Sequence, residues 1–215
     1  MGDAASRQEV IARRVDGADD AERTLVLAHG AGAPMDSPFL EFFARQLAGR
    51  GIRVVRFEFP YMHARREGRR RPPDREPVLL ATWREVVTDL GGGPRLVIGG
   101  KSLGGRMASL VADELGARGL VCLGYPFHPP GKPDRLRVSH LEQLRTSALI
   151  VQGTRDALGS REDVQGYRLS KAIRVHWIED GDHSLKPRAR SGRTERQNLE
   201  EAVEQVAAFI ARLER

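Results

Sequence analysis

The feature that most constrains this chain is a serine that lies between two glycines at the end of a strand pattern. An apolar run, Leu96–Ile98, leads into Gly100 and Gly104, which frame Ser102 as G-x-S-x-G. After the serine, the apolar residues share one helical face: Met107, Leu110, Val111 and Leu115. A strand, a tight turn bearing serine and a helix predict a nucleophile elbow, whose glycines leave room for the neighbouring strand and helix. The helix N-terminus beneath the serine favours negative charge that develops there.

Two other interpretations of this run are open. The sequence Gly100-Lys101-Ser102 also looks like the end of a phosphate-binding P-loop. That loop needs a glycine five residues before the Gly-Lys pair, and Arg95 stands there. A glycine-rich turn with an idle serine is the plainer alternative, and the loops that follow the other predicted strands argue against it.

Length and composition favour one globular domain. We expect residues 1–215 to form that domain, with residues 1–23 as a partly ordered N-terminal edge. The net charge of +6 comes mostly from arginine and indicates either an anionic partner or a solvated basic surface. A single cysteine, Cys122, permits no internal disulfide and suits a reducing compartment. No apolar run approaches the roughly 18 residues that span a bilayer, so we expect a cytoplasmic protein without a membrane segment.

Hydrophobic patterning predicts alternating strands and helices. The strands are expected over residues 24–28, 52–59, 96–98, 119–124, 148–152 and 173–178, with an edge strand over 8–15. The helices are expected over 38–50, 78–90, 103–115, 136–144, 160–169 and 194–213, the last two capped by Ser160 and by Thr194 with Gln197. The arginine-rich stretch 61–77 has no periodic apolar face and is expected to be a long loop.

This alternation predicts an α/β fold with a mainly parallel sheet flanked by helices. In such sheets, functional sites lie beyond the C-terminal ends of the strands. Four chemically useful residues directly follow predicted strands: His29, Ser102, Asp156 and His183. A chain of this length without a large insertion predicts little or no cap domain over the site.

Ser102, Asp156 and His183 form the candidate catalytic set. A serine hydroxyl is a weak nucleophile until a base takes its proton, and a histidine held by a carboxylate is the usual base. The chain order serine, aspartate, histidine is one of the orders in which this triad occurs. The oxyanion of a tetrahedral intermediate needs N–H donors, which we expect from the backbone of Leu103 and of Ala31 in the first post-strand loop.

The other candidate residues have plainer explanations. Asp180 and Asp182 are the alternative acids, although Asp182 is adjacent to His183 and poorly placed to reach its ring. The five remaining histidines are expected in solvated, structural or turn-shaping roles: His29, His63, His128, His140 and His176. His176, Asp180, Asp182 and His183 lack a recognised metal-ligand spacing. Cys122 lies in an apolar strand, which indicates a buried thiol.

At this point the sequence resembles the α/β-hydrolase superfamily, and within it a predicted-hydrolase branch similar to dienelactone hydrolase-like and KANL3/Tex30-like proteins. The stretches that carry the resemblance are 29–32, 57–62, 68–73, 99–105, 124–133, 153–159 and 181–183. The resemblance implies an α/β-hydrolase fold with a serine-type site at Ser102, Asp156 and His183. Dienelactone hydrolases have a cysteine where this chain has Ser102, so their substrate does not carry over.

We therefore predict a serine hydrolase that cleaves an ester or thioester without a metal or cofactor. His29, Lys101 and His128 are the candidate substrate-binding residues. Lys101 and the arginines at 65–71 favour a small acyl substrate that carries a carboxylate or phosphate, unless both features are only solvated surface. The alternative from another class is a catalytically silent interaction module with the same fold. Nucleic-acid binding is disfavoured because no aromatic residues lie between the arginines. The oligomeric state is left open.

Overall fold

The computed structural model describes residues 11–213, which are organised around one seven-stranded sheet. The strand order is β1-β3-β2-β4-β5-β6-β7, and every neighbouring pair is parallel except β1 with β3. The strands are β1 (Arg13–Asp16), β2 (Arg23–Ala28), β3 (Ile52–Phe57), β4 (Leu96–Lys101), β5 (Gly119–Leu123), β6 (Ala148–Gly153) and β7 (Ile173–Ile178). The helices are α1 (Pro38–Ala48), α2 (Pro60–Arg66), α3 (Glu76–Asp89), α4 (Leu103–Val111), α5 (Arg161–Gln165) and α6 (Glu195–Arg212), with 3₁₀ turns at Gly93–Arg95 and Ala189–Ser191.

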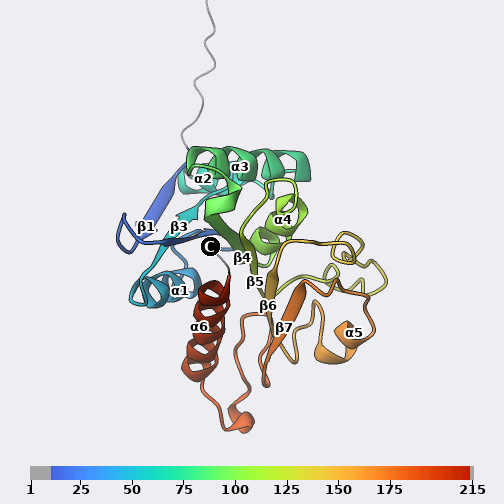
Figure 1. The fold of residues 1–215 in the computed structure, drawn as a ribbon. Coiled ribbons are helices and arrows are strands. Elements are labelled where there is room, and N and C mark those ends of the chain that lie inside the picture. The colour runs from blue at the N-terminus through green and yellow to red at the C-terminus, as the bar shows by residue number, and fades with distance from the viewer. Residues whose placement is uncertain (1–10, 214–215) are drawn as a thin grey trace, which may run out of the picture.

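The central strands are buried on both faces, as their continuous apolar runs predict. In β2, Val26 packs into one apolar layer with α3 and α4, whereas Leu25 packs into a second layer with α1 and α6. Figure 1 shows this arrangement, with α2, α3 and α4 on one side of the sheet and α1 and α6 on the other. The predicted α/β architecture, with its mainly parallel sheet between helices, is confirmed.

Several predicted segments differ from the structure, among them the helix expected over 103–115, which ends at Val111 as α4. The helix expected over 136–144 is wrong, because this segment consists of turns that bury Val138, Leu141 and Leu144. The stretch 61–77 is not simply a loop: α2 occupies Pro60–Arg66, and α3 already begins at Glu76. The edge strand expected over 8–15 lies partly outside the described residues, and β1 covers Arg13–Asp16.

The capping predictions are confirmed. Ser160 caps α5 and Thr194 caps α6, each through a reciprocal capping box with Asp163 and Gln197 respectively. However, α5 ends at Gln165, four residues before the predicted end at Leu169.

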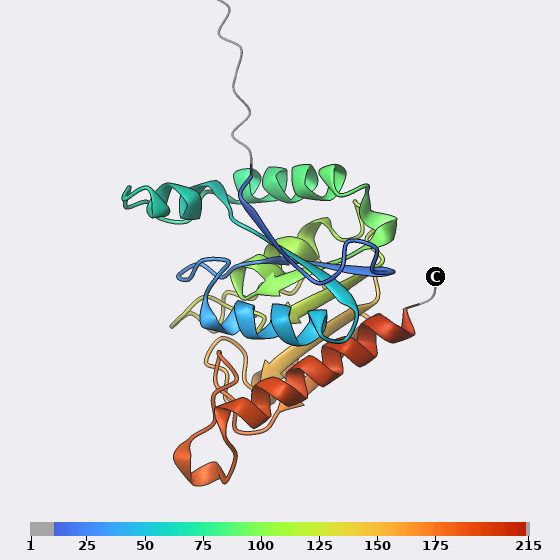
Figure 2. The same cartoon turned by 90° about the vertical axis from the view of Figure 1, so that its left-hand side faces the viewer.

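The C-terminal edge of the sheet carries no inserted helical subdomain within residues 11–213. The main excursion near it is α2 with the loop that follows, which projects from the body of the molecule (teal in Figure 2). No helix in the part of the chain that the structure describes has the length and apolar character needed to cross a membrane. The strand ends of β2, β4 and β6 are therefore left close to a surface that a small molecule can reach.

Candidate active site

Ser102 lies on a strained turn between β4 and α4. Its backbone has φ of 50° and ψ of −113°, a conformation that non-glycine residues rarely adopt. A Cβ at Gly100 would lie 2.3 Å from the carbonyl oxygen of Ala28, and one at Gly104 would lie 2.4 Å from the same atom. The predicted need for two glycines is therefore confirmed, because the end of β2 packs against both positions.

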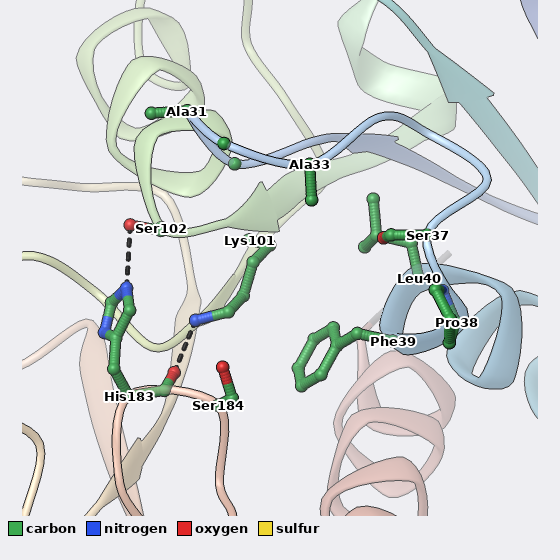
Figure 3. Close-up of a pocket in the computed structure, with 12 residues that line it drawn as sticks. Ala31, Ala33, Ser37, Pro38, Phe39, Leu40, Lys101, Ser102, His183 and Ser184 are labelled. Carbon is green, nitrogen blue, oxygen red and sulfur yellow. Dashed lines mark hydrogen bonds between the residues drawn. The ribbon is translucent and has the colours of Figure 1, made fainter.

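The structure brings the three predicted catalytic residues together. The Ser102 Oγ lies 2.9 Å from His183 Nε2, and His183 Nδ1 lies 2.8 Å from Asp156 Oδ2 (Figure 3 shows the first contact). Asp156 is fully buried, whereas the His183 side chain is about 29% exposed. A buried carboxylate bound to Nδ1–H leaves Nε2 free to accept the serine proton, which is the geometry that general-base activation requires.

Asp156 is held in place by two further donors. Gln152 Nε2 donates to Asp156 Oδ2 at 2.8 Å, and the backbone N–H of Leu158 donates to Oδ1 at 2.8 Å. The two alternative acids are engaged elsewhere. Asp180 pairs with Arg188, whose hydrogen bond lowers the pKa of that carboxyl to about 2, and Asp182 accepts the backbone N–H of Ser184.

A second serine–histidine contact occurs away from this site. Ser109 Oγ lies 2.9 Å from His140 Nε2, and Ser109 is buried within α4. Burial lowers the pKa of His140 to about 4. No carboxylate among residues 11–213 bonds to this imidazole, and neither residue lines the cavity described below. We therefore interpret the pair as structural, and it offers a useful control.

The two predicted oxyanion donors are placed differently in the fold. The backbone N–H of Leu103 is at the first turn of α4, and that of Ala31 is in the loop after β2. Neither N–H has an acceptor within residues 11–213. From α2, the Tyr61 hydroxyl donates to the carbonyl oxygens of Gly30 and Ala31, both at 3.2 Å, and Arg65 also donates to Ala31. These contacts hold the loop through its carbonyl groups and leave the N–H of Ala31 without an acceptor among residues 11–213.

A cavity of about 380 Å³ opens beside Ser102 and His183. Its remaining wall comes from the loop after β2, the start of α1 and the residues next to the serine and histidine: Gly30, Ala31, Gly32, Ala33, Ser37, Pro38, Phe39, Leu40, Lys101 and Ser184. Lys101 lies between His183 and Phe39 in Figure 3, and its ammonium donates to the carbonyl oxygen of His183. Of the three candidate substrate-binding residues, Lys101 therefore lies in the wall of the cavity.

The other two candidates, His29 and His128, lie outside the cavity wall. His29 is fully buried, and its Nε2 accepts the backbone N–H of Phe59 at 3.1 Å. His128 is 4% exposed and its Nδ1 lies 3.0 Å from the carbonyl oxygen of Pro129. Neither residue lines the cavity. Both imidazoles form hydrogen bonds with nearby backbone groups. The sequence pattern alone does not reveal these bonds.

The arginine-rich segment also lies outside the cavity wall. Arg65, Arg70, Arg71 and Pro72 line a separate open cavity of about 480 Å³. Arg66 binds both Glu58 and Asp36, so part of this charge is neutralised within the protein. Of the basic residues predicted near the site, only Lys101 borders the space beside Ser102.

Two supporting residues were not predicted. Gln152 is buried in β6 and bonds Asp156, and Tyr61 holds the loop that carries Ala31. A glutamine inside an otherwise apolar strand is a detectable signal, because a buried amide needs several partners. The sequence gives a weaker indication for Tyr61, because its hydroxyl contacts residues that are far away in the sequence.

Comparisons with known proteins agree with this fold. The sequence profile of the alpha/beta hydrolase domain family matches residues 21–211. Est1E from Butyrivibrio proteoclasticus, solved with ferulic acid bound, has a TM-score of 0.70 at 16% identity, covering 94% of this chain and 95% of that chain. XC6422 from Xanthomonas campestris, described as a serine hydrolase without lid, has a TM-score of 0.66 at 18% identity, covering 94% and 88%.

A third solved structure, the putative non-heme bromoperoxidase BpoC from Mycobacterium tuberculosis, has a TM-score of 0.74 at 10% identity, covering 95% of this chain and 97% of that chain. At these identities the solved structures establish the fold, while the family profile extends over nearly all the described residues. The strand order, the serine turn and the profile lead to one conclusion: the chain belongs to the alpha/beta hydrolase domain family.

Proposed function

We propose that this protein is a serine hydrolase that cleaves a carboxylic ester or thioester through Ser102, His183 and Asp156. The observation that carries the proposal is the continuous contact from the strained serine through His183 to a fully buried carboxylate. A structural role alone gives no reason for a serine in a conformation that costs of order 1–3 kcal/mol.

In the first half of the reaction, Ser102 Oγ attacks the carbonyl carbon while its proton passes to His183 Nε2. The carbonyl π electrons move to oxygen, and the N–H groups of Leu103 and Ala31 are the proposed donors to that oxyanion. The tetrahedral intermediate then breaks its bond to the leaving group, which takes the proton from His183 and departs as an alcohol or thiol.

In the second half, a water molecule repeats the attack on the acyl-enzyme. His183 takes one proton from the water, and the new oxyanion occupies the same donors. Collapse of this intermediate breaks the bond to Ser102 Oγ, which recovers the proton and releases a carboxylic acid. The Asp156 carboxylate stabilises the imidazolium that forms in each half.

The proposed family branch and domain organisation fit this assignment. The segments that suggested the dienelactone hydrolase-like and KANL3/Tex30-like branch include Tyr61, which supports the loop of Ala31. We further propose that residues 1–215 form one domain, which is supported by a single sheet containing all seven strands of residues 11–213.

The proposal is tested by labelling the full chain with a fluorophosphonate probe, which reacts only with activated serines. We expect labelling of wild type that is lost in Ser102→Ala and His183→Ala. Ser109→Ala is the matched control, because Ser109 also contacts a histidine but lies outside the cavity, and it should label like wild type. A folded wild-type protein that does not label would contradict the proposal and favour the interaction-module alternative.

A further inference from the structure

The cavity beside Ser102 contains one charged group whose position is tightly specified. The ammonium of Lys101 donates to the carbonyl oxygen of His183 and lies 5.4 Å from the centroid of the Phe39 ring. Gly124, whose φ is +66°, leaves room for the contact between Lys101 and His183. A Cβ at this position would lie 2.7 Å from Lys101 Nζ and 2.7 Å from the His183 carbonyl oxygen. Three separate segments of the chain are therefore arranged so that this ammonium reaches the site.

The ammonium is incompletely paired. It has three N–H donors, and the carbonyl of His183 is its one hydrogen-bond acceptor within residues 11–213. Asp156 and Asp182 attract it through longer-range charge interactions, and neither forms an ion pair with it. Burial lowers the pKa of Lys101 to about 8. An ammonium with spare donors beside an apolar wall is costly unless a ligand supplies the missing acceptors.

The rest of the wall has no competing cation. Apart from Lys101 itself, three serines (Ser37, Ser102 and Ser184) and His183, the lining side chains are apolar or absent. The exposed arginines Arg65, Arg70 and Arg71 line the separate cavity. A ligand in this cavity thus meets an apolar surface from Pro38, Phe39 and Leu40 with a single positive charge beside the histidine. This combination matches a short hydrocarbon chain that ends in an anion.

We propose that the substrate of this site is a carboxylate-bearing ester or thioester, whose carboxylate accepts the two spare N–H groups of Lys101. The inference rests on the proposed hydrolase function and narrows it to a substrate class. A carboxylate suits the site better than a phosphate, because one ammonium balances one negative charge. A dianionic phosphate would leave excess negative charge close to Asp156 and Asp182, which already interact with Lys101.

The test compares ester pairs that differ only in a terminal carboxylate. In one series the acid lies on the acyl side: monoethyl succinate, glutarate and adipate against ethyl butyrate, valerate and hexanoate. In the other it lies on the alcohol side: acetylated hydroxy acids against alkyl acetates of equal length. Hydrolysis of these alkyl esters is followed by pH-stat titration of the acid that is released. Aryl esters are avoided because a carboxylate in the same molecule cleaves them without the enzyme. We expect wild type to prefer the carboxylate member of at least one pair by about 10- to 100-fold in kcat/KM, the range for one charge-assisted contact.

Lys101→Met should abolish this preference. The variant also loses the contact with His183, so both rates can fall, and the ratio within each pair is therefore the quantity that decides. Arg70→Met is the matched control, since it removes a positive charge from the exposed loop outside the cavity, and it should keep the wild-type ratio. Lys101→Arg retains the charge and should keep part of the preference.

A measurement on wild type covers the case in which Lys101→Met fails to fold. Adipic acid monoamide, which carries one carboxylate and an amide in place of the ester, should inhibit hydrolysis of a neutral ester competitively at pH 7. The inhibition should weaken severalfold by pH 9.5 as Lys101 loses its proton. The charged and titratable groups that face the ammonium are Asp156, Asp182 and His183. Arg70→Met should show the same change with pH as wild type.

The outcomes separate the two proposals. Fluorophosphonate labelling of Ser102 without a carboxylate preference, or with a preference that survives in Lys101→Met, would overturn the substrate class and leave the hydrolase function standing. Inhibition by adipic acid monoamide that is absent at pH 7, or equal at pH 7 and 9.5, would also overturn it. Absence of labelling in folded wild type would overturn both. A preference that disappears in Lys101→Met and persists in Arg70→Met would support both.

Discussion

Replacing Asp156 by asparagine tests how the buried carboxylate acts on His183. Asp156 Oδ2 accepts from both Gln152 and His183, whereas Oδ1 accepts only the backbone N–H of Leu158. An asparagine can therefore keep two hydrogen bonds by placing its oxygen at the Oδ2 position. In that orientation the His183 proton stays on Nδ1, so the imidazole keeps the tautomer that accepts a proton from Ser102. What the variant loses is the negative charge.

The size of this loss follows from the geometry. The Asp156 carboxylate and the imidazolium formed during catalysis are in hydrogen-bond contact at 2.8 Å, which places their charge centres roughly 4 Å apart. At an effective dielectric constant of about 20, two unit charges at that separation attract by about 4 kcal/mol. This dielectric constant suits a pair in which Asp156 is fully buried and the His183 side chain is about 29% exposed. We expect kcat to fall by about 10³-fold in Asp156→Asn.

The assay is the steady-state kcat for a reactive aryl acetate, with the rate of fluorophosphonate labelling as a second readout. If the asparagine turns the other way and reverses the tautomer, the loss should approach 10⁴-fold. A loss below about tenfold would refute the reasoning, because it would mean that Asp156 does not stabilise the imidazolium. Unchanged thermal stability of Asp156→Asn would show that the kinetic effect is not caused by unfolding.

Three further predictions concern the support of the site. Gly100→Ala puts a methyl group against the carbonyl of Ala28 and should lower the free energy of unfolding by about 1–3 kcal/mol or more, measured by urea denaturation; an unchanged midpoint would contradict the packing. Gln152→Leu leaves several buried backbone groups unpaired and should cost at least about 3 kcal/mol in the same assay, while kcat falls less than in Asp156→Asn because the carboxylate keeps its other donors; equal losses in kcat would argue against this. Burial lowers the pKa of His29 from 6.5 to about 4, so the unfolded chain binds a proton in that window that the folded chain does not. Stability should therefore fall as pH drops from 6.5 to 4, by up to about 1.4 kcal/mol per pH unit from this group, and it should fall less steeply in His29→Gln. Thermal denaturation of both proteins at pH 7 and 4.5 measures this loss, and an equal loss of stability in wild type and His29→Gln would refute the prediction.

Much of the fold could be predicted because the informative signals are local. The buried strands are continuous apolar runs, and the capping boxes of Thr194 and Ser160 need only residues three positions apart. The helix expected over 136–144 was wrong because Val138, Leu141 and Leu144 repeat every three residues, a spacing that successive turns also satisfy.

Helix α2 is a second segment that differs from the prediction. Helix α2 has Pro60 at its first position, a recognisable start signal. Its short apolar face did not stand out among the arginines that flank it.

The sequence was sufficient to predict which loops come together to form the site. Parallel strands bring the loops of Ser102, Asp156 and His183 to one edge, so their chain order was enough to group them. Which side chains enter the cavity was not predictable, because that depends on nearby backbone acceptors and donors. His29 is bound to the N–H of Phe59, and the Lys101 ammonium reaches His183 only because Gly124 leaves space.

The backbone of Ser102 also limits how stable this protein can become. Its φ and ψ are the mirror image of an ordinary extended conformation, which glycine adopts readily and serine does not. The conformational penalty of about 1–3 kcal/mol at one residue is a large fraction of the 5–15 kcal/mol that typically separates folded from unfolded domains. Selection for thermal stability alone would favour glycine at position 102, so a thermostability screen that ignores activity should enrich Ser102→Gly. Retention of serine in such a screen would mean that the turn is less strained than its angles imply.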